Sequence, residues 1–164
     1  MLVRVWLFAV LLASPLSAQT VSPGLEHANP EMAGEAVQLE VRQRVEEFLM
    51  KLGTRDVAAV RTMLAPKAFV AIAREKDGAY TNTYQTGEEF LATFEKSAAQ
   101  PRFEEPLTNV RVTIDSGALA YVRADFKVVR DGKVLSSSVD HFTLLKEPDG
   151  WKIAVIAYTS NPVK

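Results

Sequence analysis

Hydrophobic residues first recur at helical spacing between Glu35 and Leu52. They stand three, four or seven positions apart, which places them on one face of an α-helix, and charged residues hold the other face. Gly53 follows directly, and glycine is common just after the last turn of a helix. The pattern predicts an amphipathic helix, whose apolar positions are Val37, Val41, Val45, Phe48, Leu49 and Leu52.

Two shorter helices are indicated by their capping residues. Asp56 stands before an apolar pattern over residues 57–64 and can accept a hydrogen bond from the first turn of that helix. Thr86 and Glu89 have the spacing of a capping box, in which the two residues bond each other's backbone. The sequence therefore predicts a second helix after Asp56 and a third helix after Thr86.

The last third of the chain alternates strand-forming segments with turn signals. The turns lie at residues 114–117, 130–133 and 147–150, and the segments between them are rich in Val, Ile, Phe, Tyr and Thr. An Asp-Gly pair between two such segments is a strong hairpin signal, because tight turns need positive φ angles. This pattern predicts a four-stranded antiparallel meander. Two short strands, at residues 69–73 and 80–84, precede it and bring the sheet to about six strands.

The order of these elements resembles the nuclear transport factor 2-like superfamily and, within it, the SnoaL-like small domains. The resemblance spans residues 35–160. Its landmarks are Arg55-Asp56, Gly117-Ala118-Leu119-Ala120 and Gly150-Trp151-Lys152-Ile153. It implies an α+β, cone-shaped roll with three helices packed in the concavity of a curved, mainly antiparallel sheet. This superfamily includes isomerases, cyclases, dehydratases, hub domains and non-enzymatic binders, so the fold does not select a function.

The beginning of the chain has the pattern of an export signal. Arg4 supplies a positive start, residues 5–13 form an unbroken apolar run, and small residues lead to Ala18. The run is too short to cross a bilayer, which takes ~20 apolar residues. We therefore expect a periplasmic or secreted protein with no membrane span after cleavage. The expected division is a signal peptide over residues 1–18, a flexible leader over 19–34, a SnoaL-like domain over 35–160 and a tail over 161–164.

Composition narrows the classes of function. The chain has no cysteine, which excludes a lipoprotein anchor and any disulfide framework. The net charge is −1 with scattered lysines and arginines, whereas nucleic-acid binding usually shows a basic stripe. One of the two histidines, His27, falls in the leader, so His141 alone cannot form a metal-ligand cluster. With no phosphate or dinucleotide motif either, we expect no metal, no cofactor and no nucleic acid.

The period of two along a strand assigns residues to the faces of the sheet. If Asp131-Gly132 is a two-residue turn, Phe126 pairs with Ser137 and Val122 with His141. The concave face would then carry Ala120, Val122, Ala124, Phe126 and Val128, with Leu135, Val139, His141 and Thr143 opposite. Pairing Lys146 with Trp151 at the last turn adds Ala154, Ile156 and Tyr158. A register slip by one residue would exchange the two faces.

This register predicts a pocket in the cone with three polar groups, those of His141, Tyr158 and Arg111. His141 would be a proton acceptor or a ligand anchor, unless it is only a wall histidine bonded to the backbone. Arg111 faces inward only if Ser116-Gly117 is a two-residue turn, and a three-residue turn would move it outward. Such groups suit a small, largely apolar ligand with an anionic or carbonyl group. The candidate pocket residues are His141, Tyr158, Arg111, Phe126, Val122 and Ile156.

Three functions stay open at this point. The first is cofactor-free binding of a small ligand in the cone. The second is a cofactor-free isomerase, cyclase or hydrolase with His141 as acid or base and Tyr158 or Arg111 as its electrophilic partner. The third is a periplasmic protein–protein interaction module. Asp125 and Asp140 both fall on the outer face in this register, which disfavours the carboxylate-base chemistry of the isomerases in the superfamily.

The outer face of the predicted sheet is too apolar to face only water. We expect it to form a homodimer interface, with a different protein as the alternative partner. Arg123 and Asp140 fall opposite each other in this face, as a surface ion pair or as part of the interface. The expected interface residues are Tyr121, Arg123, Asp140, Phe142, Leu144, Trp151, Ile153 and Val155.

Overall fold

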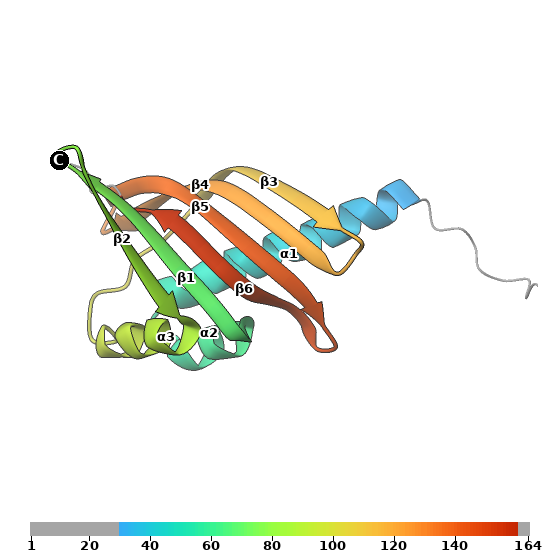
Figure 1. Ribbon diagram of the computed structural model, residues 1–164, viewed down its shortest axis with the longest axis horizontal. Helices are drawn as coiled ribbons and strands as arrows, with labels where there is room; N and C mark the ends of the chain where they lie inside the picture. Colours follow the sequence, from blue (N-terminus) through green and yellow to red (C-terminus); the bar gives the residue numbers. More distant parts are fainter. Residues whose placement is uncertain (1–29, 161–164) are drawn as a thin grey trace, which may run out of the picture.

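The computed structural model describes residues 30–160, with three helices and six strands in this range (Figure 1). The predicted signal peptide, most of the leader and the C-terminal tail lie outside the described residues. Among residues 30–160, no helix is long and apolar enough to cross a membrane. The elements are α1 (Pro30–Gly53), α2 (Val57–Met63), β1 (Leu64–Lys76), β2 (Ala79–Thr86), α3 (Gly87–Lys96), β3 (Leu107–Asp115), β4 (Leu119–Arg130), β5 (Lys133–Glu147) and β6 (Gly150–Thr159).

The six strands form one sheet in the order β2-β1-β6-β5-β4-β3. All neighbours are antiparallel except β1 and β6, which are parallel. Helix α1 runs along one face of the sheet, and α2 and α3 lie together near one end (Figure 1). The predicted α+β architecture, with three helices against about six mainly antiparallel strands, is confirmed.

The predicted local signals form as expected. Asp56 accepts a hydrogen bond from the Ala59 backbone N–H at 3.1 Å and caps α2. Both bonds of the capping box between Thr86 and Glu89 are present at the start of α3. Asp131 has a φ of 50° and the next residue, Gly132, a φ of 72°, as a two-residue hairpin turn requires. Helix α1 begins at Pro30, earlier than the expected Glu35.

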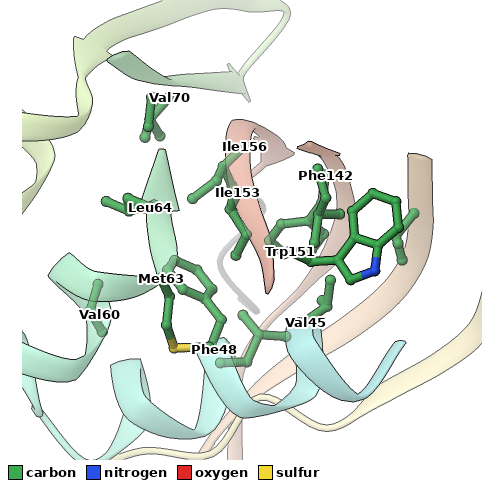
Figure 2. Packing of buried hydrophobic residues seen from close by; sticks show 14 of the residues in the cluster. Val45, Phe48, Val60, Met63, Leu64, Val70, Phe142, Trp151, Ile153 and Ile156 are labelled. Atoms are coloured by element: carbon green, nitrogen blue, oxygen red, sulfur yellow. The ribbon is translucent and has the colours of Figure 1, made fainter. Parts of the chain in front are cut away.

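The hydrophobic core lies between the helices and the concave face of the sheet (Figure 2). Phe48 of α1 meets Phe142 of β5 edge to face, with 6.2 Å between the ring centroids. Trp151 and Ile153 of β6 are buried in the same cluster. The predicted apolar face of α1 is therefore the face that packs against the sheet.

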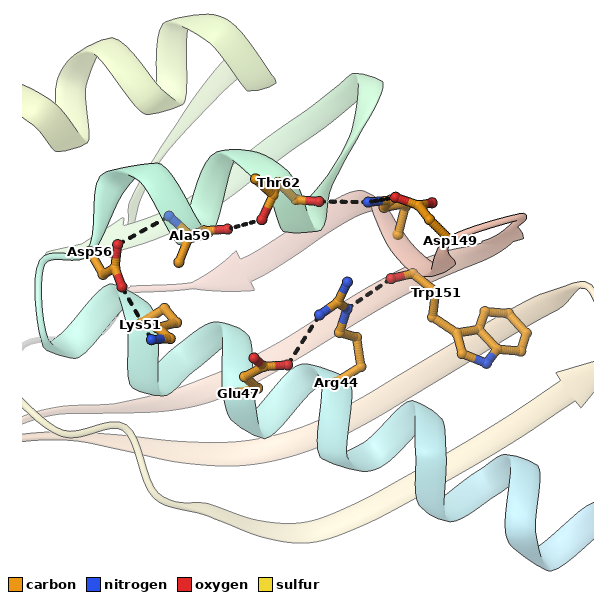
Figure 3. Close-up of polar contacts among 9 residues, drawn as sticks. Arg44, Glu47, Lys51, Asp56, Ala59, Thr62, Asp149 and Trp151 are labelled. Carbon is orange, nitrogen blue, oxygen red and sulfur yellow. Dashed lines mark hydrogen bonds and ion pairs between the residues drawn. The ribbon is translucent and has the colours of Figure 1, made fainter.

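Polar contacts of backbone carbonyls also join the helices to β6 (Figure 3). Arg44 of α1 donates from Nε to the Trp151 carbonyl at 2.9 Å. Lys152 donates from Nζ to the Thr62 carbonyl at the end of α2 at 2.7 Å, and the same ammonium pairs with Asp149. These contacts satisfy carbonyl groups at the end of a helix and at a strand start, where regular pairing leaves them open.

A β-bulge between β4 and β5 overturns the predicted register. Arg130 pairs with Lys133 as expected, but Val128 pairs with Ser136 and Val129 with Val134, so Leu135 is an extra residue. Phe126 therefore pairs with Ser138, and Val122 pairs with Phe142 rather than with His141. The prediction was wrong because a strict period of two cannot accommodate an inserted residue, and each insertion exchanges the faces of all residues beyond it.

A second bulge lies between β5 and β6. Lys146 pairs with Trp151 as expected, but Leu144 pairs with Ile153 and Thr143 with Val155, which leaves Ala154 as the extra residue. Trp151 and Ile153 precede this bulge, and they face the core rather than the predicted outer face because the first bulge already exchanged the faces of the β5 residues they pair with. Beyond Ala154 the faces of β6 exchange once more, so that Ile156 and Tyr158 face the helices, as predicted.

The predicted outer patch is wrong in its composition. Tyr121, Arg123 and Val155 stay on the outer face of the sheet, whereas the other members are buried on the helix side, at 4% exposure or less: Asp140, Phe142, Leu144, Trp151 and Ile153. Arg123 lies opposite His141 rather than Asp140, and it forms an ion pair with Asp125 at 2.7 Å. The apolar patch from which a homodimer was inferred therefore belongs largely to the core.

Candidate functional site

A cavity of about 290 Å³ lies between the helices and the concave face of the sheet. This volume is at the lower end of small-molecule sites, which span roughly 300–1,000 Å³. Aromatic residues are the largest group in its wall, and Leu49, Leu52, Val128 and Ile156 are its aliphatic members. The seven aromatic lining residues are Phe48, Phe90, Phe94, Phe103, Phe126, Phe142 and Tyr158. A wall of this kind favours a small, flat, apolar molecule.

One side of the cavity depends on a close approach at Gly53, the last residue of α1. A Cβ atom at this position would collide with the Phe103 carbonyl, and the Phe103 N–H donates to the Gly53 carbonyl at 3.2 Å. Glu104 then exchanges two backbone hydrogen bonds of 2.8 Å with Val129 of β4. The segment before β3 is thus held against both α1 and the sheet, and it brings Phe103 and Glu105 to the cavity wall.

Two carboxyl groups face this apolar space. Asp140 of β5 is only 4% exposed, and burial, together with the negative charge of Glu105, raises its pKa to about 8. Burial also raises the pKa of Glu105 to about 7, against the opposing effect of the Arg55 charge. Near neutral pH the pair therefore holds protons that ordinary carboxylates have lost. Such groups can donate a hydrogen bond when protonated and accept a proton when ionised.

Tyr158 lies beside this pair. It is directly opposite Asp140 in the ladder between β5 and β6, and burial raises the pKa of its phenol. Its hydroxyl therefore stays protonated and available as a hydrogen-bond donor on the cavity wall. The site thus combines two carboxyl groups and a phenol on a wall that is mainly apolar.

Arg55 adds a positive charge to the same wall. Its guanidinium lies 4.7 Å from the Phe103 ring centroid and 5.5 Å from that of Phe94. Nη1 donates to Ser97 Oγ at 3.1 Å, and Nη2 donates to the Pro101 carbonyl at 3.4 Å. Burial, followed by the charge of Arg130, lowers the pKa of Arg55, but a guanidinium keeps its proton at any physiological pH.

The residues predicted for the pocket are divided between the two faces of the sheet. Tyr158, Phe126 and Ile156 line the cavity. Val122 faces the same side but is only 1% exposed, within the core cluster. His141 is exposed on the outer face, opposite Arg123.

Arg111 is also on the outer face. Asp115 pairs with Leu119, so the turn between β3 and β4 has three residues, Ser116 to Ala118, and Arg111 lies opposite Arg123. This is the outward arrangement that a three-residue turn predicts. Neither Arg111 nor His141 lines the cavity, so the cavity does not bring the predicted Arg, His and Tyr together; Arg111 and His141 instead line a hollow on the outer face.

Sequence reasoning missed Asp140, Glu105 and Arg55 as cavity residues. Asp140 follows the run Ser136-Ser137-Ser138, whose identical residues offer no alternation from which a bulge could be detected. Glu105 lies in an irregular segment with no periodicity. Arg55 was noticed only as a landmark at the head of α2, because its orientation depends on contacts with a segment far along the chain.

Metal binding has no support in residues 30–160. No group of three or more His, Cys, Asp or Glu side chains in this range lies close enough to hold an ion. Glu105 and Asp140 supply two carboxyl groups only.

Solved structures define the class of fold. A "Putative Scytalone Dehydratase" from Novosphingobium aromaticivorans is 13% identical with a TM-score of 0.66, and the alignment covers 80% of this chain and 88% of that one. A putative dehydratase of the NTF2-like family from Streptomyces avermitilis is 15% identical with a TM-score of 0.59, covering 79% and 97%. An NTF2-like protein with a cystatin-like fold, also from N. aromaticivorans, is 15% identical with a TM-score of 0.59, covering 80% and 86%. The protein has the NTF2-like fold, as its sequence landmarks indicated.

Sequence comparison defines the family more narrowly. Residues 36–159 match the family model described as "Putative lumazine-binding", and the chain belongs to this family. No curated protein is detectably similar to the chain.

Proposed function

We propose that this protein binds a small, flat, largely aromatic molecule in the cavity between the helices and the sheet, without a cofactor. The observation that carries the proposal is the combination of seven aromatic side chains with two carboxyl groups whose pKa values are raised to about 7 and about 8. Aromatic walls supply contact area, and a few polar groups in an apolar site fix the orientation of a ligand.

The polar groups favour a ligand with a hydrogen-bond acceptor. Protonated Asp140 and the Tyr158 phenol are both donors, and they are direct neighbours across two strands. A carbonyl oxygen or a ring nitrogen would accept from one or both of them. The description of the family as lumazine-binding agrees with such a ligand, since a lumazine is a flat heteroaromatic ring system with carbonyl groups.

We also propose that the protein works outside the cytoplasm. The support is the sequence pattern of residues 1–18, with its positive start, short apolar run and small residues before Gln19. Expression of the full chain in a Gram-negative host, followed by N-terminal sequencing of the periplasmic fraction, tests this point. A mature chain beginning at or near Gln19 is expected, and an intact N-terminus held in the inner membrane would contradict it.

A cavity-filling substitution tests the site of binding. Val128 lines the cavity, and Val128→Phe should fill part of its volume. Val134 lies outside the cavity at 41% exposure, so Val134→Phe adds the same ring without filling it. Calorimetric titration with 2-acetylnaphthalene, a flat ketone, should show binding by the native protein and by Val134→Phe but weaker binding by Val128→Phe. Absence of binding to the native protein, or equal binding by both variants, would refute the proposal.

A second candidate function is cofactor-free proton transfer. The observation that favours it is Asp140, a carboxyl group in an apolar site with its pKa raised to about 8 and a phenol beside it. An ionised Asp140 could remove a proton next to a carbonyl group while the Tyr158 phenol donates to the carbonyl oxygen. In this alternative the base is Asp140, since His141 lies on the opposite face of the sheet.

A further inference from the structure

The guanidinium of Arg55 is held in place on the cavity wall by contacts from two other segments. Phe94 of α3 and Phe103 contribute their ring faces, and Ser97 and Pro101 accept hydrogen bonds from Nη1 and Nη2. We propose that Arg55 anchors an anionic group of the ligand, so that the cavity takes an aromatic acid. This inference rests on the proposed ligand-binding function and specifies its substrate class.

One nitrogen of the Arg55 side chain has no partner in the part of the chain that the structure describes. Among the described residues, the Nε atom of Arg55 is buried and has no hydrogen-bond partner, although the residue lines the cavity. Buried polar groups are nearly always paired, and an unpaired one calls for an explanation. A carboxylate that meets the guanidinium in the cavity would give it a charged acceptor, and charge-assisted bonds of this kind are stronger than neutral ones.

A second positive charge lies near Arg55. Arg130 is close enough to Arg55 to lower its pKa, and the Arg130 Nε is likewise buried without a partner among residues 30–160. Glu105 is the negative charge that acts on Arg55, and its pKa is raised to about 7. Below that pH Glu105 is mostly protonated, so this carboxyl group no longer offsets the repulsion that Arg130 exerts on Arg55. An anionic ligand would supply the missing charge.

The backbone of Arg55 also has an uncommon conformation. Its φ angle is 65°, a left-handed conformation that is uncommon for residues other than glycine, asparagine and aspartate. The turn is short, since the Arg55 N–H donates to the Leu52 carbonyl and the Arg55 carbonyl accepts from the Val57 N–H, both at 3.1 Å. A residue with a Cβ atom is strained at such a position, and strained residues of this kind gather at ligand sites.

Two ligands that differ by one charge test the inference: 2-naphthoate and 2-acetylnaphthalene have similar shape and volume, but only the first is an anion. Calorimetric titration at pH 6 should show that the native protein prefers the acid by about tenfold or more, as expected for one charged hydrogen bond. Arg55→Gln should lose this preference through weaker binding of the acid, with binding of the ketone changed less than about threefold. Arg102→Gln, which removes an exposed arginine beside Phe103, should retain the preference.

The possible results separate this inference from the proposed function. Equal affinity of the native protein for the two ligands would overturn the role of Arg55, whether or not Arg55→Gln folds, and would leave ligand binding in place. Loss of both ligands in a folded Arg55→Gln protein would also overturn it, because the residue would then support the cavity and not the charge. Binding of neither ligand to the native protein would refute the proposed function itself.

Discussion

Asp140 on β5 and Tyr158 on β6 are directly opposite each other in the sheet, and both face the cavity. Side chains in such a cross-strand pair lie about 4.5–5.5 Å apart at their Cβ atoms. Two bulges produce this pairing, one that turns Asp140 inward and one that moves β6 by one residue. The pair places a carboxyl group with a raised pKa next to a phenol, and most of the chemistry proposed for the protein depends on it.

The positions of neighbouring residues on β5 provide the first prediction. Phe142 is 2% exposed in the core, whereas His141 is exposed on the outer face. Phe142→Ala should lower the free energy of unfolding by about 3–5 kcal/mol, while His141→Ala should change it by less than about 0.5 kcal/mol. Urea denaturation followed by circular dichroism measures both. A large loss for His141→Ala with a small one for Phe142→Ala would mean that the register without bulges is correct.

The stability of the protein should depend on the ionisation of Asp140. Its pKa is about 8 in the folded protein and near 3.8 in an ordinary environment, so the folded state binds the extra proton. The corresponding stability is fully present below about pH 4 and is lost as the pH rises through about 8. The melting temperature and the free energy of unfolding should both fall over this range. Asp140→Asn should reduce the fall in the free energy of unfolding by on the order of 2 kcal/mol or more.

A matched control for this pH dependence is Asp125→Asn on the outer face. Hydrogen bonding from Asn109, with help from Arg123 and Arg111, lowers the pKa of Asp125. The contribution of Asp125 to stability therefore changes only in acid, below the usual range of a carboxyl group. The stability of Asp125→Asn should depend on pH between pH 5 and pH 9 in the same way as that of the native protein. An equal flattening in both variants would show that Asp140 is not the group responsible.

Proton transfer by the site can be measured without knowing the natural substrate. In heavy water, an ionised Asp140 should exchange the methyl protons of 2-acetylnaphthalene, with a rate that rises as the pH passes about 8. Asp140→Asn should reduce the exchange to the rate of buffer alone, and Tyr158→Phe should slow it by roughly 10²–10³-fold through loss of the donor to the oxygen. Proton nuclear magnetic resonance measures the exchange as loss of the methyl signal. Exchange at the same rate in Asp140→Asn would exclude this base.

The two glycines of α1 provide a test of how the cavity wall is built. Gly53→Ala places a Cβ atom against the Phe103 carbonyl, whereas a Cβ atom at Gly34 meets nothing within 4 Å. Gly53→Ala should destabilise the protein by about 1–3 kcal/mol and weaken ligand binding, because the Phe103 segment must move away. Gly34→Ala should instead stabilise it by up to about 1 kcal/mol through helix propensity. Thermal unfolding and titration with 2-acetylnaphthalene measure the two effects.

Much of the fold could be read from local chemistry. The apolar spacing of α1, the cap at Asp56, the capping box at Thr86 and the Asp131-Gly132 turn all act within a few residues, so their signals are complete in the sequence. The order of the elements was sufficient to indicate the NTF2-like class. Side-chain alternation on β4 was also predicted well, since Ala120, Val122, Ala124 and Phe126 are all buried.

The positions of the functional groups required the tertiary structure. Whether an extra residue at Leu135 or Ala154 is accommodated as a bulge depends on the packing of two strands against the helices, and one such residue exchanges the faces beyond it. Asp140 was therefore expected outside and lies inside, while His141 was expected inside and lies outside. Glu105 and Arg55 reach the cavity through contacts between distant segments, such as that of Gly53 with Phe103. The sequence by itself determined the elements and their order, and only the packing of the elements decided which side chains face the cavity.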